Sequence, residues 1–201
     1  MGKVEDKKLI KRTALLTHAF SLFMSNGITN TSISDITTNA GVAKGTFYSY
    51  FKDKDDLILK LLTQKTEMLF NHSLEELEKQ EDMNVDDTII FIINDVIEQL
   101  MADTKLLRFV NKNLSSGFYK KALTNDQFKQ ETNFADSFYK IIQKDGDTWT
   151  DPLLMLYTVV ELVSSTCHTI LLESEPVDYE TFKPYLFQCI RSIINVYKNP
   201  K

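Results

Sequence analysis

The segment from Thr31 to Ile58, TSISDITTNAGVAKGTFYSYFKDKDDLI, decides the fold of this chain. Ser32 begins a short helical stretch, and Asp35 follows three residues later, as in a capping box with Asp in place of Glu. Gly41 ends that stretch, and a second short helical stretch starts near Lys44. Because two helices packed at a steep angle need a short turn without a Cβ penalty, this order predicts a helix-turn-helix.

Five apolar side chains in this segment are expected to hold the angle between the two helices: Ile33, Ile36, Ala40, Val42 and Phe47. The second helix is then free to lie in the major groove of DNA, with its first residues at the edges of the bases.

The remaining residues of the second helix are small, hydroxylic or basic, and none is acidic. Hydroxyls and ammonium groups suit phosphates, and Thr or Tyr also suits a thymine methyl. We interpret Tyr48 as a contact rather than a core aromatic, because Phe47 and Phe51 already fill the apolar role. Lys54 is interpreted as a phosphate ligand at a helix start rather than a solvated lysine. The predicted DNA-binding residues are Thr31, Ser32, Ala43, Lys44, Gly45, Thr46, Tyr48, Ser49, Tyr50 and Lys54.

Helical patterns extend in both directions from this segment. A preceding helix runs from about Asp6 to Asn26 and ends at Gly27; its expected apolar face contains Ile10, Ala14, Ala19, Leu22 and Phe23. A following helix, capped by Asp53, runs to about Gln80. Further helices are expected over residues 88–101, 105–113, 125–143, 152–173 and about 182–198, where Pro184 should kink the last helix or delay its start.

The predicted architecture is therefore all-α. An N-terminal helix-turn-helix DNA-binding domain spans residues 1–51, and a helical ligand-binding and dimerisation domain spans residues 52–201.

Charge and composition fit this division. The chain has 201 residues and a formal net charge of -5. Residues 1–50 hold six cations and three acids, so they carry +3 and the remainder carries -8. Such asymmetry is typical of a DNA-facing module on an acidic body, although a chance excess of three charges gives the same pattern. Lys11 and Arg12 are equally compatible with phosphate contact and with a solvated position.

The segment Thr31–Ile58 resembles the TetR family of bacterial transcriptional regulators, and the resemblance covers about the first 60 residues. The positions that carry it are Gly27, Ile36, Gly41, Val42, Phe47, Tyr48, Phe51, Lys54 and Leu57. His18 and Thr37 depart from the pattern, since the family usually has a small residue there. The resemblance implies a homodimer, a ligand cavity in each body, and a four-helix dimer interface made by the last two helices. It also implies a repressor that a small molecule releases from its operator.

Aromatic and polar side chains of the body are candidates for that cavity, with a core role as the alternative. Glu161 stands out, because a carboxylate inside an apolar helix is costly unless it is paired. Phe118 and Tyr139 belong to the wider set, and the predicted ligand-binding residues are Phe109, Phe134, Phe138, Tyr157, Glu161 and His168. Residues 153–172 and 182–197 are too apolar for isolated surface helices, which indicates an interface.

Two other functions are weighed against a ligand-released repressor. A regulator without a small-molecule ligand, controlled by a protein partner or acting as an activator, is compatible with the sequence. An enzyme using Cys167, His168 and Glu161 is disfavoured, because adjacent residues on a helix point in different directions. We expect no catalytic residue, metal or cofactor. The expected partners are operator DNA, an effector and a second copy, in the cytoplasm and away from the membrane, since the longest apolar run is too short to span a bilayer.

Overall fold

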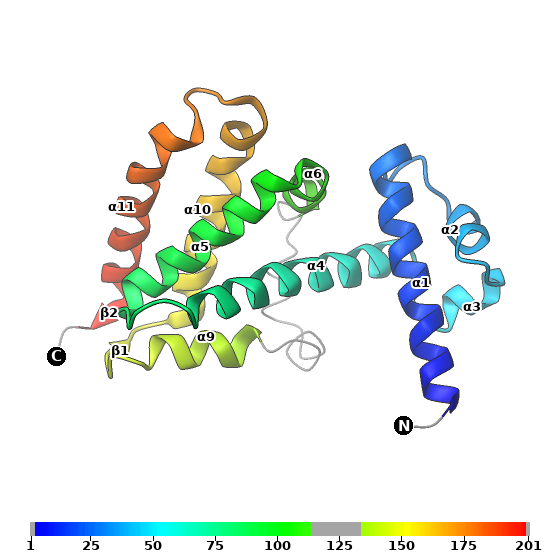
Figure 1. The fold of residues 1–201 in the computed structure, drawn as a ribbon, viewed down its shortest axis with the longest axis horizontal. Coiled ribbons are helices and arrows are strands. Elements are labelled where there is room, and N and C mark those ends of the chain that lie inside the picture. Colours follow the sequence, from blue (N-terminus) through cyan, green and yellow to red (C-terminus); the bar gives the residue numbers. More distant parts are fainter. Residues whose placement is uncertain (1–2, 114–133, 200–201) are drawn as a thin grey trace. The chain divides into compact units, whose positions relative to one another are not determined.

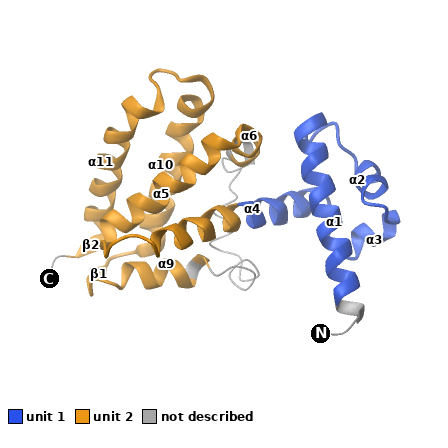
Figure 2. Ribbon diagram, in the orientation of Figure 1, with its two compact units in different colours: residues 1–65 blue, residues 66–201 orange. Residues whose placement is uncertain are grey.

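The computed structural model describes residues 3–113 and 134–199, and the chain divides into two compact units. Unit 1 spans Met1–Lys65 and unit 2 spans Thr66–Lys201 (Figure 2). The division falls inside a long helix, α4 (Lys54–Leu77), whose first half is part of unit 1. Leu57, Leu61 and Leu62 explain this, because all three are buried at 0–1% exposure.

Unit 1 contains α1 (Lys3–Asn26), α2 (Ile33–Asn39) and α3 (Lys44–Tyr48), together with the first half of α4 (Figure 1). Its core is made by Leu15, Leu16, Ala19, Phe23, Ile36, Phe47, Phe51 and Leu57, each at most 3% exposed. The buried stripe of α1 thus differs from the predicted one. Ile10 is 67% exposed, because the first turns of α1 extend beyond the partners that would cover it.

Unit 2 contains the second half of α4 and a set of helices that pack around a second core. These are α5 (Val85–Ala102), α6 (Thr104–Asn113), α9 (Phe134–Ile142), α10 (Pro152–Glu173) and α11 (Tyr179–Tyr197). α10 and α11 lie side by side as a helical hairpin (Figure 1). The fully buried members of this core include Ile97, Ile142, Met155, Leu186 and Ile190.

Two short strands, which the sequence patterns did not predict, close the base of unit 2. β1 (Thr148–Trp149) pairs antiparallel with β2 (Lys198–Asn199), with Thr148 opposite Asn199. Lys198 Nζ lies 2.8 Å from Asp147 and 3.4 Å from Asp86. These ion pairs raise the pKa of Lys198, chiefly through the hydrogen bond to Asp147.

The observed helix ends agree with the capping signals in the sequence. Asp151 accepts a hydrogen bond from the Leu154 N–H (3.0 Å), and Pro152 is the first residue of α10. α11 begins at Tyr179 with Asp178 as its N-cap, so the expectation that Pro184 delays the helix start is wrong. The predicted helix over residues 125–143 is seen from Phe134; its earlier part, and Phe118, lie outside the described residues.

α10 is the one helix of the described segments with the length and apolar composition needed to cross a bilayer, which by itself is weak evidence. Only 22% of its most apolar 18-residue window is buried in the single chain. Most of the other residues of α10 are half-buried.

Candidate nucleic-acid interface

The turn between α2 and α3 is fixed by Gly41, whose φ of +65° lies in the left-handed region. The Gly41 N–H donates to the Thr38 carbonyl (3.1 Å), and the Val42 N–H donates to the Thr37 carbonyl (3.0 Å). This pair of hydrogen bonds is a Schellman motif, which ends a helix and redirects the chain. The predicted role of Gly41 is therefore confirmed.

Phe47 anchors α3 to the rest of unit 1. It is 0% exposed, and its ring lies 5.4 Å from the ring of Phe51. Ile36 of α2 is also fully buried, whereas Ile33, Ala40 and Val42 are half-buried at the edge of the same core. The buried aromatic holds α3 at a fixed angle, so its outward residues form a rigid surface.

Ser32 closes the first turn of α2 through a capping box. Its Oγ accepts from the Asp35 N–H (3.1 Å) and lies 2.7 Å from Asp35 Oδ2, to which it donates, while the Ser32 N–H donates to the same oxygen (2.8 Å). The side-chain hydrogen bond from Ser32, then its backbone N–H, lowers the pKa of Asp35. In this conformation the polar groups of Ser32 already have a partner.

Thr31 and Lys54 stabilise the loop between α1 and α2. Thr31 is 1% exposed, and its hydroxyl donates to the Gly27 carbonyl (2.8 Å). Lys54 Nζ donates to the carbonyls of Ile28 (3.0 Å) and Thr31 (3.1 Å). Both side chains thus satisfy backbone carbonyls of this loop, a role that sequence reasoning did not assign to them.

The outward surface of the motif consists of Ala43, Lys44, Gly45, Tyr48 and Ser49, all exposed, with Thr46 and Tyr50 half-buried beside them. A Cβ built on Gly45 meets no atom within 4 Å, so the backbone there is open to a large ligand. Tyr48 is 55% exposed, although its ring edge rests on Phe47 at 5.4 Å between centroids. Its hydroxyl end is therefore held in place yet available. The surface has no carboxylate between residues 40 and 51.

The predicted ligand-binding residues of the body do not gather at one place. Phe109 and Phe138 are buried in unit 2 at 2% and 5% exposure, and the half-buried Phe134 packs on Phe70 at 4.6 Å between ring centroids. Tyr157, Glu161 and His168 instead follow the outward face of α10. Tyr157 and His168 are exposed and Glu161 is half-buried, so these three lie on the surface of the single chain rather than in its interior.

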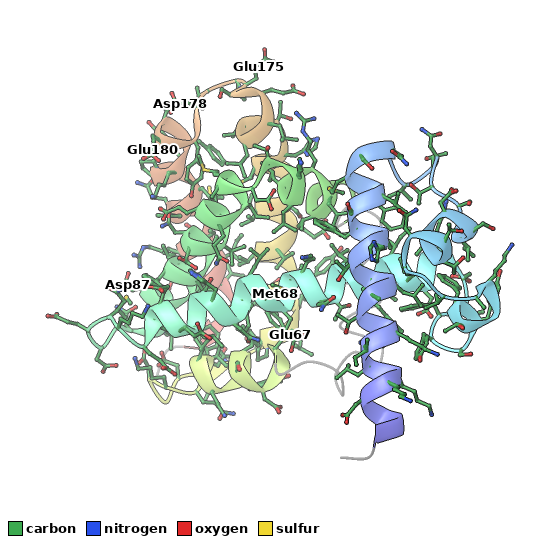
Figure 3. All side chains as sticks on the ribbon, turned by 45° about the vertical axis from the view of Figure 1, so that its right-hand side comes forward. Glu67, Met68, Asp87, Glu175, Asp178 and Glu180 are labelled. Carbon is green, nitrogen blue, oxygen red and sulfur yellow. The ribbon has the colours of Figure 1, made fainter. Side chains whose placement is uncertain are left out.

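An apolar groove of about 500 Å³ lies where α10 turns into α11. Its lining includes Ile170, Pro176, Val177 and Phe182, and none of the predicted ligand-binding residues belongs to it. Figure 3 shows Glu175, Asp178 and Glu180 around this turn.

Cys167 and His168 have no arrangement suited to nucleophilic catalysis. Burial raises the pKa of Cys167 to about 11, so the side chain stays a thiol at neutral pH and is a poor nucleophile. In the described segments, no group of three or more His, Cys, Asp or Glu side chains is placed to hold a metal ion.

Comparison with known proteins identifies the class to which this geometry belongs. Residues 15–61 match the model of the bacterial regulatory proteins of the tetR family. A helix-turn-helix-type transcriptional regulator of Staphylococcus aureus (strain USA300) is 24% identical over 170 residues, covering 84% of this chain and 85% of the relative.

Solved structures share the fold. A putative TetR-family transcriptional regulator from Mesorhizobium loti MAFF303099 has a TM-score of 0.58 at 17% identity, covering 96% of this chain and 98% of the other. The regulator FadR from Bacillus subtilis, solved with stearoyl-CoA, has a TM-score of 0.58 at 20% identity, covering 89% and 96%. The all-α fold with an N-terminal helix-turn-helix is thereby confirmed.

The motif and the fold together define a helix-turn-helix DNA-binding regulator. Over residues 15–61 the chain is similar to the TetR family of transcriptional regulators, and its fold is shared with solved TetR-family regulators.

Proposed function

We propose that the chain is a repressor that binds an operator through α3 and leaves it when a small molecule binds the body. The observation that carries the DNA-binding part is the exposed, acid-free surface of α3 on a helix-turn-helix fixed by Gly41 and Phe47. Operator binding by a repressor excludes other proteins from the same DNA. We further propose that the protein acts in the cytoplasm, where this DNA lies.

The residues proposed to contact DNA include groove contacts and a phosphate contact. The groove would be contacted by Gly45, Tyr48 and Ser49, with Ala43, Thr46 and Tyr50 beside them. A phosphate would be contacted by Lys44. Ser32 would contribute at the edge of the surface. Thr31 and Lys54 support the interface through the loop carbonyls that they bind, and reach a phosphate only if those hydrogen bonds exchange.

A homodimer is proposed from the outward faces of α10 and α11. Leu154 (47% exposed) and Tyr157 (38%) lie on α10, and Tyr185 (65%) and Val196 (77%) lie on α11. Leu154 and Tyr157 lie on one side of α10, and Tyr185 and Val196, three turns apart, lie on one side of α11. A second copy covering these sides would bury their apolar side chains, and Glu161 and His168 would then lie at the interface.

The proposed effector site lies in unit 2, and α4 carries its signal. This helix is continuous from Lys54 to Leu77, so it belongs to both units. In unit 2, Asp95 of α5 accepts from Ser73 Oγ (2.7 Å) of α4 and from Gln99 Nε2 (2.7 Å), which also donates to the Leu69 carbonyl (3.1 Å). An effector that favours another arrangement of α4 on α5 would shift the population of DNA-binding states.

The functional division proposed here stays at residues 1–51 and 52–201. The first part holds the surface for DNA, and the second begins with the helix that transmits effector binding. The effector itself is proposed to be largely apolar, because the described core of unit 2 is made of aliphatic and aromatic side chains. That FadR of Bacillus subtilis was solved with stearoyl-CoA supports the view that this fold accepts a ligand.

A second candidate is a regulator controlled by a protein partner, or an activator. The apolar groove between α10 and α11, with Glu175 at its edge, is the observation that favours a partner. An activator would use the same DNA surface, since the position of the operator determines the direction of regulation.

Effector release is tested by competition. Labelled DNA from upstream of the protein's own gene is saturated with protein, and compounds of differing polarity are added while fluorescence anisotropy is followed. We expect an apolar compound to lower the anisotropy, and to do so less in a variant with a substitution in the unit 2 core. If no compound releases the protein from the DNA, but a cell-extract fraction that contains only protein-sized molecules does, the result would favour the regulator controlled by a protein partner.

A further inference from the structure

The buried stripe of α1 changes from apolar to cationic where the helix leaves the core of unit 1. Leu15, Leu16, Ala19 and Phe23 are at most 3% exposed and form the packed part of the stripe. Continuing the same helical spacing toward the N-terminus places Arg12 and Lys8 on this side, at positions i-4 and i-8 from Leu16. Lys8 is exposed and Arg12 is half-buried.

The N-terminal turns of α1 contribute no fully buried side chain between residues 6 and 14. Figures 1 and 3 both show that these turns run past α3 within unit 1. Across the described residues, neither Lys8 nor Arg12 has an ion-pair or hydrogen-bond partner. Two unpaired cations thus continue the core-facing side of α1 into the turns beyond the core of unit 1.

We infer that Lys8 and Arg12 form a second phosphate-binding surface, which contacts the DNA backbone beside the groove that α3 enters. The inference rests on the proposed DNA binding by α3. The partner is nucleic acid rather than another polyanion, because the two cations belong to the same compact unit as the acid-free surface of α3. A spacing of i and i+4 places the two Cα atoms about 6 Å apart along the helix axis, so both long side chains can reach phosphates of the same short stretch of DNA.

Cations that neutralise phosphates release counterions, so their contribution appears in the salt dependence of binding. The experiment compares the wild-type protein with the double variant Lys8→Gln/Arg12→Gln, using a mixed-sequence duplex at several salt concentrations. Mixed-sequence DNA suffices, because phosphate contacts do not depend on the base sequence. A matched control, Lys105→Gln/Lys140→Gln, removes the same charge from exposed positions of unit 2. A second variant, Lys8→Arg/Arg12→Lys, keeps both charges.

We expect the double variant to lower the slope of log K against log salt by about two for each bound protomer. If the salt-dependence lines meet at 1 M salt, this corresponds to binding weakened up to about 60-fold at 0.1 M salt. The control and the charge-conserving variant are expected to keep the wild-type slope. A double variant with the slope of the control would overturn the inference and leave the function of α3 intact. Absence of DNA binding by the wild-type protein, even at low salt, would overturn both.

Discussion

At the scale of single residues, substitutions at two glycines of the helix-turn-helix are expected to have different effects, one on folding stability and the other on DNA affinity. Gly41 has a φ of +65°, whereas Gly45 lies in α3 with no atom within 4 Å of a built Cβ. We predict that Gly41→Ala lowers the free energy of unfolding by about 1–2 kcal/mol, because an alanine is strained in the left-handed region. Urea unfolding followed by circular dichroism measures this loss.

Gly45→Ala is predicted to have the opposite pattern. Alanine has a better helix propensity than glycine, so the free energy of unfolding should stay unchanged or rise by up to about 1 kcal/mol. The added methyl nonetheless projects from the surface proposed for DNA, so operator affinity should fall. If Gly45→Ala binds the operator as tightly as the wild-type protein, the DNA does not approach this backbone.

The sequence predicted the residues that build the motif better than it predicted which of their neighbours are accessible. Spacing along the sequence was enough to assign Gly41 to the turn and Phe47 to the core, because both roles depend on residues close by in the chain. Thr31 and Lys54 carry hydroxyl and ammonium groups that suit phosphates equally well, but the structure directs them to carbonyls of the loop between α1 and α2. For Lys54 this choice depends on contacts with residues 23 and 26 positions earlier in the chain, which the spacing along one helix does not contain.

At the scale of elements, the capping box of α2 predicts a pH dependence of stability. Hydrogen bonds from Ser32 lower the pKa of Asp35 below its usual value of 3.8 in the folded chain. This carboxylate therefore contributes stability above pH 3.8, and the contribution is lost as the pH falls through the lower folded pKa. Ser32→Ala should remove part of this acid dependence and cost about 1 kcal/mol near neutral pH.

Thermal unfolding of both proteins between pH 2 and 7 measures the effect. The control is Ser34→Ala, which changes an exposed serine within α2 itself. Equal acid sensitivity in Ser32→Ala and the wild-type protein would show that the capping box does not contribute in solution.

The hairpin of α10 and α11 makes a separate prediction about assembly. Tyr185 and Val196 are 65% and 77% exposed in the single chain, so a charge at either position should be tolerated by the folded monomer. In the proposed dimer the same charge would be buried against a second copy, which costs several kcal/mol. We predict that Tyr185→Glu/Val196→Glu sediments as a folded monomer while the wild-type protein sediments as a dimer.

Met101→Glu is the matched control, because Met101 is 42% exposed and belongs to α5 rather than to α10 or α11. It should remain dimeric. A wild-type protein that sediments as a monomer at micromolar concentration would contradict the proposed interface.

The helices themselves were predictable, since periodicity and caps are local; the outward direction of Tyr157 and His168 was not, because both faces of α10 are apolar.

At the scale of the whole molecule, the proposed functions of recognition and regulation are divided along one continuous helix. Unit 1 carries the surface proposed for DNA and unit 2 carries the larger core, and α4 belongs to both. The all-α class followed from helical periodicity along the chain. The strands β1 and β2 did not, because two-residue strands depend on pairing between residues 49 and 51 positions apart.

The measurement that tests the central claim most directly is a fluorescence anisotropy titration at two salt concentrations. DNA from upstream of the protein's own gene is compared with a scrambled duplex of the same length. The account predicts a preference of about 10³ or more for the upstream DNA, with binding to both weakened by salt. Failure to bind either duplex, even at low salt, would contradict the assignment of α3 as a DNA-recognition helix.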